Sequence, residues 1–194
     1  MRKEYHGEKA MLKKINIKNF SVKFVDIMIG IVLGLGFQWW VALKEPWQFV
    51  AFVFAYLDIV DYWIDYGPAL KKFPPKREID VFLDVAICFS LFLYIYATQL
   101  HVIYFLLAFA SIKLLDFFWL VSSKRSYRPT GFDRTYINTW AIVDGVEVAM
   151  AISLAFFASL VPAPALAVVL SFILMRVAAR IVASAKYGKV YLAN

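Results

Sequence analysis

The stretch FVDIMIGIVLGLGFQWW, residues 24–40, is apolar except for Asp26 near its start and Gln38 near its end. With its flanks it is long enough to cross a bilayer, because a membrane-spanning α-helix needs about 20 mostly apolar residues. Five further segments have the same character, and the predicted spans are residues 22–42, 47–67, 79–98, 101–122, 138–160 and 163–185. The sequence therefore predicts an all-α polytopic membrane protein with six transmembrane helices.

The composition agrees with this class. Of the 194 residues, 62% are hydrophobic, against about 45–50% in soluble domains, and the mean hydropathy is +0.68. In a soluble protein the net charge of +7 would suggest a nucleic-acid partner. Here the basic residues lie in connections and tails, which is the pattern of the positive-inside rule. We therefore expect membrane lipid, and no nucleic acid, as a partner.

The basic residues also predict the topology. The N-terminal segment and the connections at residues 68–78 and 123–137 hold most of the Lys and Arg, whereas the other three connections hold only Lys44. This alternation places both termini in the cytoplasm of a cell-membrane protein. We expect a basic N-terminal segment at residues 1–21, a transmembrane domain at 22–186 and a tail at 187–194. Gly67-Pro68 is expected to end the second helix.

The chain also contains a candidate internal repeat. Two apolar residues precede each of Asp26, Asp84 and Asp144, which lie 58 and 60 residues apart, and each has a charged counterpart 32 residues on, at Asp58, Asp116 and Arg176. Spacings of this size predict three hairpin repeats, about 22–67, 79–122 and 138–185. A chance match of so short a pattern is the alternative.

Many charged residues lie within the predicted spans. Inserting a charged side chain near the bilayer centre costs about 2.5–3.5 kcal/mol of free energy, so such residues face protein or water. As pathway lining we predict Asp26, Asp58, Asp61, Asp84, Asp116, Asp144 and Glu147, with Lys113, Arg176 and Arg180 as internal counter-charges. Because the acids outnumber the bases, we expect some acids to be protonated, hydrated or ion-bound. A purely structural network, with Asp65 at interfacial water, and a polar small-molecule site are the alternatives.

The first helix carries two further features. Gly30 and Gly34 form a pair that allows close approach by another helix or subunit. Residues 24–31, FVDIMIGI, resemble the Phe-Ser-Asp-x-x-x-Ala-Ile opening of the prokaryotic TMEM175-like channels. Residues 55–66, from AYL at 55–57 to WIDY at 63–66, resemble the end of their second helix. The resemblance implies a tetrameric, potassium-permeable channel lined by the first helix. It also implies an apolar constriction at Ile27, Ile31 and Leu35.

These features predict movement of potassium or protons across the membrane by a homo-oligomer, and they favour a channel. The alternatives are a non-transporting scaffold or subunit of a larger complex and a component for uptake of a small solute. We expect no enzyme, because the sequence has no Walker loop, no Gly-x-Ser-x-Gly elbow and no Gly-x-Gly-Asp protease stretch. The histidines and the single cysteine lack metal-ligand spacing, so we expect no metal site and no cofactor.

Overall fold

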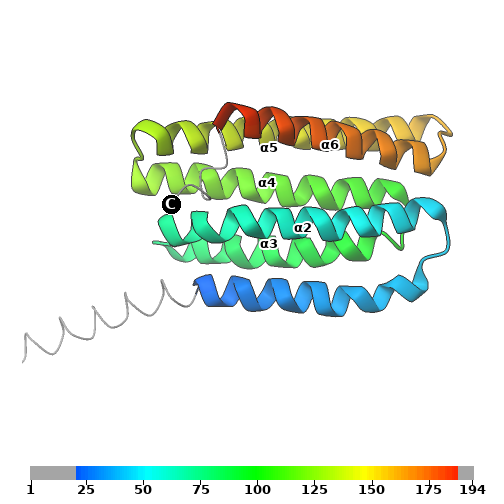
Figure 1. Ribbon diagram of the computed structural model, residues 1–194, viewed down its shortest axis with the longest axis horizontal. Helices are drawn as coiled ribbons and strands as arrows, with labels where there is room; N and C mark the ends of the chain where they lie inside the picture. The colour runs from blue at the N-terminus through cyan, green and yellow to red at the C-terminus, as the bar shows by residue number, and fades with distance from the viewer. Residues whose placement is uncertain (1–20, 188–194) are drawn as a thin grey trace, which may run out of the picture.

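The computed structural model describes residues 21–187, which fold into a bundle of antiparallel helices (Figure 1). The first helix spans Ser21–Ala42, and its end, Phe37–Ala42, is a 3₁₀-helix, η1. It is followed by α2 (Pro46–Lys72), α3 (Glu78–Ala97), α4 (Val102–Tyr127), α5 (Gly131–Leu160) and α6 (Ala165–Tyr187). All six helices are long and apolar enough to span a membrane, and no strand occurs within the described residues. The predicted all-α class is confirmed, as is the presence of six helices long and apolar enough to cross a membrane.

The helices form layers across the bundle. The first helix lies along one edge, α2 and α3 come next, α4 follows, and α5 and α6 cover the opposite side (Figure 1). The central helix is α4, which contacts α3, α5 and α6, while α2 contacts α3 and α6. Residues from α2, α4, α5 and α6 therefore meet in the interior.

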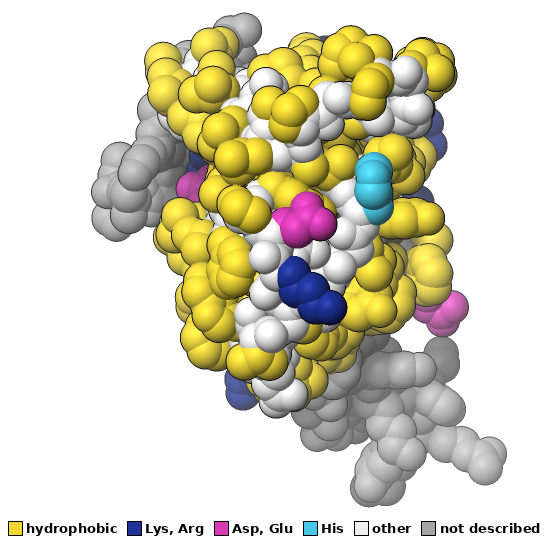
Figure 2. All heavy atoms as spheres, turned by 90° about the vertical axis from the view of Figure 1, so that its right-hand side faces the viewer, with side chains coloured by type: hydrophobic (Ala, Val, Ile, Leu, Met, Phe, Trp, Pro, Cys, Tyr) yellow, Lys and Arg dark blue, Asp and Glu magenta, His cyan; other side chains and the backbone are white. Residues whose placement is uncertain are grey.

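The two ends of the bundle differ in charge. We call the end with the α2–α3 and α4–α5 connections the basic end, and the described chain begins and ends toward it (Figure 1). At the other end, the apolar end, the surface is mostly hydrophobic, with isolated charged side chains (Figure 2). This difference matches the charge alternation in the sequence, although which side of the membrane each end faces stays a prediction.

Three helices extend beyond their predicted bounds. The second helix continues through Pro68 to Lys72, so Gly67-Pro68 does not end it. In the same way α4 continues to Tyr127 and α5 begins at Gly131. Hydropathy detects only the part of a helix that lies in hydrocarbon. The hydrogen bonding of the helix continues into the interface, where long basic side chains reach water. A proline near a helix end removes one hydrogen bond, which the remaining turns tolerate.

The first helix packs through a different glycine from the two that were predicted. A Cβ added at Gly36 would lie 2.8 Å from Ile95 Cδ1, so a larger residue there would force the Ile95 side chain to shift. The Tyr56 hydroxyl also donates to the Leu33 carbonyl at 2.7 Å. Gly30 and Gly34 have no described atom within 4 Å of an added Cβ. Both face away from the bundle, where they are open to lipid or to another chain.

The core at the apolar end is aromatic. We call Phe54, Tyr94, Phe105, Phe109 and Phe172 the aromatic layer. Tyr94 stacks on Phe105 with a centroid distance of 4.9 Å, and Phe109 meets Phe172 edge-on at 4.8 Å. These four rings are completely buried. Because they come from α3, α4 and α6, the aromatic layer holds these helices together.

Candidate functional site

The spacing of the interior charges places them on the inward faces of four helices. Residues three, four or seven apart lie on one side of an α-helix. This spacing relates Asp58, Asp61 and Asp65 on α2, and Lys113 and Asp116 on α4. It also relates Asp144 and Glu147 on α5, and Arg176 and Arg180 on α6. We call these nine residues the acid–base cluster.

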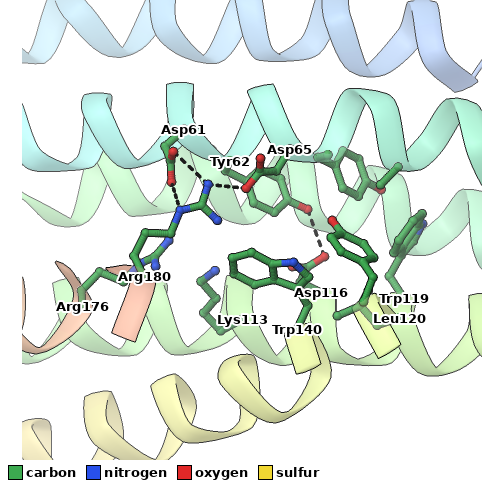
Figure 3. A pocket seen from close by; sticks show the side chains of 13 residues that line it. Asp61, Tyr62, Asp65, Lys113, Asp116, Trp119, Leu120, Trp140, Arg176 and Arg180 are labelled. Atoms are coloured by element: carbon green, nitrogen blue, oxygen red, sulfur yellow. Dashed lines mark hydrogen bonds and ion pairs between the residues drawn. The ribbon is translucent and has the colours of Figure 1, made fainter. Parts of the chain in front are cut away.

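A partly open cavity lies beside the acid–base cluster, between α2, α4, α5 and α6 (Figure 3). Its empty volume is about 430 Å³, and aromatic side chains form much of its wall. Ala69, Leu120 and Tyr136 also line it and lie toward the basic end. The cavity therefore leads from the cluster toward the basic end.

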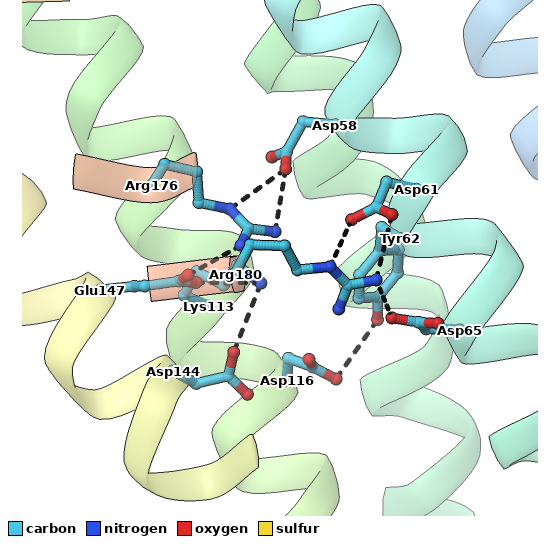
Figure 4. Close-up of polar contacts among 10 residues, drawn as sticks. All are labelled: Asp58, Asp61, Tyr62, Asp65, Lys113, Asp116, Asp144, Glu147, Arg176 and Arg180. Carbon is cyan, nitrogen blue, oxygen red and sulfur yellow. Dashed lines mark hydrogen bonds and ion pairs between the residues drawn. The ribbon is translucent and has the colours of Figure 1, made fainter. Parts of the chain in front are cut away.

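The inner part of the cluster is buried and joined by ion pairs (Figure 4). Arg176 contacts both Asp58 and Glu147 at 2.9 Å. Lys113 Nζ lies 3.1 Å from Glu147 Oε2 and 3.3 Å from Asp144 Oδ1. Leaving any one of these charges buried without a partner would cost several kcal/mol. The four helices are therefore linked through Glu147, which both bases contact.

The outer part of the cluster is more exposed and centres on Arg180. Its Nε lies 3.0 Å from Asp61 Oδ2, and Nη2 also contacts Asp65. The guanidinium lies 4.8 Å from the centroid of the Trp140 ring, within range of a cation–π interaction. Arg180 thus connects α6 to α2 across the cavity. Asp65 joins the cluster instead of only reaching interfacial water, and its spacing from Asp58 and Asp61 was the signal for this in the sequence.

Asp116 lines the cavity, and the buried Asp144 forms a pair of acids with it. The Tyr62 hydroxyl donates to Asp116 Oδ1 at 3.3 Å, and the Asp116 side chain lies beside that of Asp144 (Figure 4). Two ionised carboxylates that lie side by side in a buried site repel each other, and a proton bound to one of them removes this repulsion. The pair is therefore a candidate site for binding a proton inside the bundle.

The aromatic layer covers the cluster on the side of the apolar end. The Phe109 ring centroid lies 5.8 Å from Lys113 Nζ and 6.0 Å from Arg176 Cζ. The Tyr94 hydroxyl is buried in the same layer and has no hydrogen-bond partner among the described residues. Access to the acid–base cluster is therefore from the basic end.

Two of the predicted acids lie outside the cluster. Asp84 is completely buried and accepts hydrogen bonds from the hydroxyls of Tyr66, at 2.6 Å, and Ser21, at 3.2 Å. It lies behind the cavity wall, because Tyr66 lines the cavity. Asp26 is exposed and accepts a hydrogen bond from Trp63 Nε1 at 2.9 Å. The structure therefore brings together five of the seven predicted acids, and all three predicted bases.

The predicted constriction residues lie on the outside of the chain. Ile27, Ile31 and Leu35 are 62%, 43% and 47% exposed. They share an outward face with Asp26 and Gly30. Within one chain they line no pathway, so a constriction at these residues requires several chains around a common axis.

Among residues 21–187, no group of three or more His, Cys, Asp and Glu residues is arranged to hold a metal ion. Comparisons with protein-family models, with curated proteins and with solved structures found no match. The function is therefore inferred from the acid–base cluster and its surroundings.

Proposed function

We propose that this chain moves a monovalent cation, specifically a proton, across the cell membrane through the interior of its helical bundle. The placement of the buried Asp144 beside Asp116, which lines the cavity, is the observation that carries the proposal (Figure 4). Two neighbouring acids favour binding of a proton to one of them, and ionisable groups within a membrane-spanning bundle are costly and commonly functional. A potassium ion would instead need a ring of oxygen ligands in place of its hydration shell.

The surroundings of the pair supply a route on one side. The cavity gives water access from the basic end, which we assign to the cytoplasm by the positive-inside rule. A proton that reaches Asp116 from the cavity passes to Asp144, which also contacts Lys113. Protonation of Asp144 removes one of the two anions that face Lys113 and leaves Glu147 as its counter-charge. The proton thereby changes the contact between α4 and α5.

The aromatic layer determines the type of movement. It separates the acid–base cluster from the apolar end, so the structure corresponds to a state that is open toward one side only. Passage of a proton then requires the layer to rearrange or to admit water, and Tyr94 supplies a hydroxyl within it. This arrangement favours gated or coupled movement over a permanently open channel.

Proton flux into proteoliposomes tests the proposal. Purified protein is reconstituted with a pH-sensitive dye inside, and a pH gradient is applied with potassium and valinomycin present to prevent charge build-up. We expect the Asp116→Asn, Asp144→Asn double variant to lose flux, because an amide side chain cannot bind and release a proton as a carboxylate does. Asp133→Asn is the matched control, since Asp133 lies on α5 but pairs with Lys72 outside the cluster. Full flux in a folded double variant would overturn the proposal.

A second candidate is a non-transporting membrane subunit in which the acid–base cluster fixes helix packing. It is favoured by the partners of the bases, because each of the three contacts two acids and none is unpaired. This candidate predicts no flux in the wild-type protein under proton, potassium or sodium gradients. It also predicts co-purification with other membrane subunits. Potassium flux through a homo-oligomer would instead favour a pore along the outward face of the first helix.

A further inference from the structure

A second hollow lies on the outside of the bundle, along the α4–α5 contact. This groove has an empty volume of about 1160 Å³, and its wall is mainly apolar. Phe117 and Val121 of α4 form one side, and Ile142 and Val146 of α5 form the other. Gly145 lies between them, and a Cβ added there would meet nothing within 4 Å. The groove is separate from the cavity beside the acid–base cluster, with which it shares no lining residue.

The length of the groove matches one leaflet of a bilayer. On α5, the lining residues extend from the polar Asn138 to Ala149. The distance along the helix between these two residues is roughly 17 Å at about 1.5 Å per residue. Half of a hydrocarbon core of about 30 Å is about 15 Å. An acyl chain that starts at the interface would therefore fill the groove along its length.

One end of the groove is cationic. Lys124, three residues before the end of α4, lines the groove at the basic end. It is exposed and takes part in no ion pair within the described part of the chain. The amide of Asn138 lies at the same end. A free ammonium above an apolar groove is complementary to a phosphate headgroup above an acyl chain.

We propose that this groove is a binding site for an anionic phospholipid of the leaflet at the basic end. The phosphate binds Lys124 and Asn138, and one acyl chain lies over Gly145 toward Ala149. The charge favours lipid over a second copy of the chain as the occupant. Two copies have the same orientation in a membrane, so symmetric packing through this groove would bring their Lys124 side chains together at one depth. The inference holds whether or not the chain moves protons.

Lipid binding to the purified full-length chain tests the headgroup contact. Native mass spectrometry in detergent is used to titrate phosphatidylglycerol and phosphatidylcholine of equal chain length. A basic residue near an anionic lipid surface contributes about fivefold in affinity. We therefore expect wild-type protein to prefer phosphatidylglycerol and Lys124→Gln to weaken its binding about fivefold. Lys71→Gln, which removes an exposed lysine of α2 outside the groove, should leave it unchanged. Equal affinity of the wild-type protein for both lipids, or an unaltered affinity of the Lys124→Gln variant for phosphatidylglycerol, would overturn the assignment.

A second pair of variants tests the groove itself. Gly145→Leu fills the groove and should weaken phosphatidylglycerol binding, whereas Val182→Phe adds bulk at a 68% exposed position on α6 and should not. Cross-linking then separates lipid from a second copy. Cys88 is buried, so oxidation of an Ala149→Cys variant reports on the groove, and we expect the chain to remain monomeric on a denaturing gel. Efficient disulfide-linked dimers, or lipid binding unaffected by Gly145→Leu, would show that lipid does not occupy the groove.

Discussion

The Tyr94 hydroxyl distinguishes a transport role of the acid–base cluster from a packing role. Tyr94 is completely buried, and its hydroxyl has no hydrogen-bond partner among the described residues. Burying an unsatisfied polar group costs about 1–3 kcal/mol. Tyr94→Phe removes that group and keeps the ring contacts with Phe105 and Phe109, at 4.9 and 5.8 Å. We therefore expect the free energy of unfolding of the variant to equal that of the wild type or to exceed it by up to about 1–3 kcal/mol.

Proton flux, in contrast to stability, should fall in this variant. If the hydroxyl carries protons through the aromatic layer, Tyr94→Phe lowers proton flux in proteoliposomes on the order of 10²-fold, as expected when a proton-transfer group is lost. The matched control is Tyr56→Phe, which breaks the hydrogen bond to Leu33 and should lower stability by about 1 kcal/mol while flux persists. Unchanged flux in Tyr94→Phe would refute the relay role. A large loss of stability would refute the statement that the Tyr94 hydroxyl has no hydrogen-bond partner.

Three further variants test the cluster and the outward face of the first helix. Arg176→Met leaves Asp58 without a base and Glu147 with Lys113 alone, and we expect a loss of about 3–5 kcal/mol of stability in a denaturant titration; a loss below 1 kcal/mol would contradict the buried ion pairs. The Asp58→Asn, Asp84→Asn double variant should alter cation flux in proteoliposomes, and identical flux in a folded protein would count against both acids. Gly30→Leu adds bulk where no described atom lies within 4 Å of a Cβ. It should increase the monomer fraction in light scattering if the first helix packs against another copy, whereas a monomeric wild-type protein would exclude that packing.

The six spans were predictable because hydropathy is a local property. Each helix contains a stretch of 18 residues that is apolar on average, and the bilayer sets the length that such a stretch must match. The ends of the helices were less predictable. Residues 131–137 and 68–72 are helical although they include charged residues and a proline, because hydrogen bonding within the helix continues where apolar side chains do not.

The partners of the charged residues were not predictable from local patterns. Helical spacing showed which acids share a face of one helix. The structure brings together five of the predicted acids, Asp58, Asp61, Asp116, Asp144 and Glu147. The contact of one base with two acids depends on how four helices pack, which the spacing along one helix does not contain.

The three-hairpin repeat stays a prediction, and contacts of the first two hairpins support it. Asp26 accepts a hydrogen bond from Trp63 of the return helix, and Asp84 likewise contacts Trp119 of its own return helix. The third hairpin differs, because Asp144 contacts Lys113 from the hairpin before it. A duplicated unit would therefore have diverged most where the acid–base cluster formed.

The pairing of Asp58 with Arg176 has a consequence for how the chain is made. The two residues are separated by 118 positions, so α2 enters the membrane long before α6 has been synthesised. Until then Asp58, Asp61 and Asp65 lack the arginines that neutralise them in the finished protein. The early hairpins must wait beside the insertion machinery or a chaperone, or keep these acids protonated. Ribosome stalling before α6 should therefore yield a chain that membrane quality-control proteases degrade, and completion of α6 should end that sensitivity.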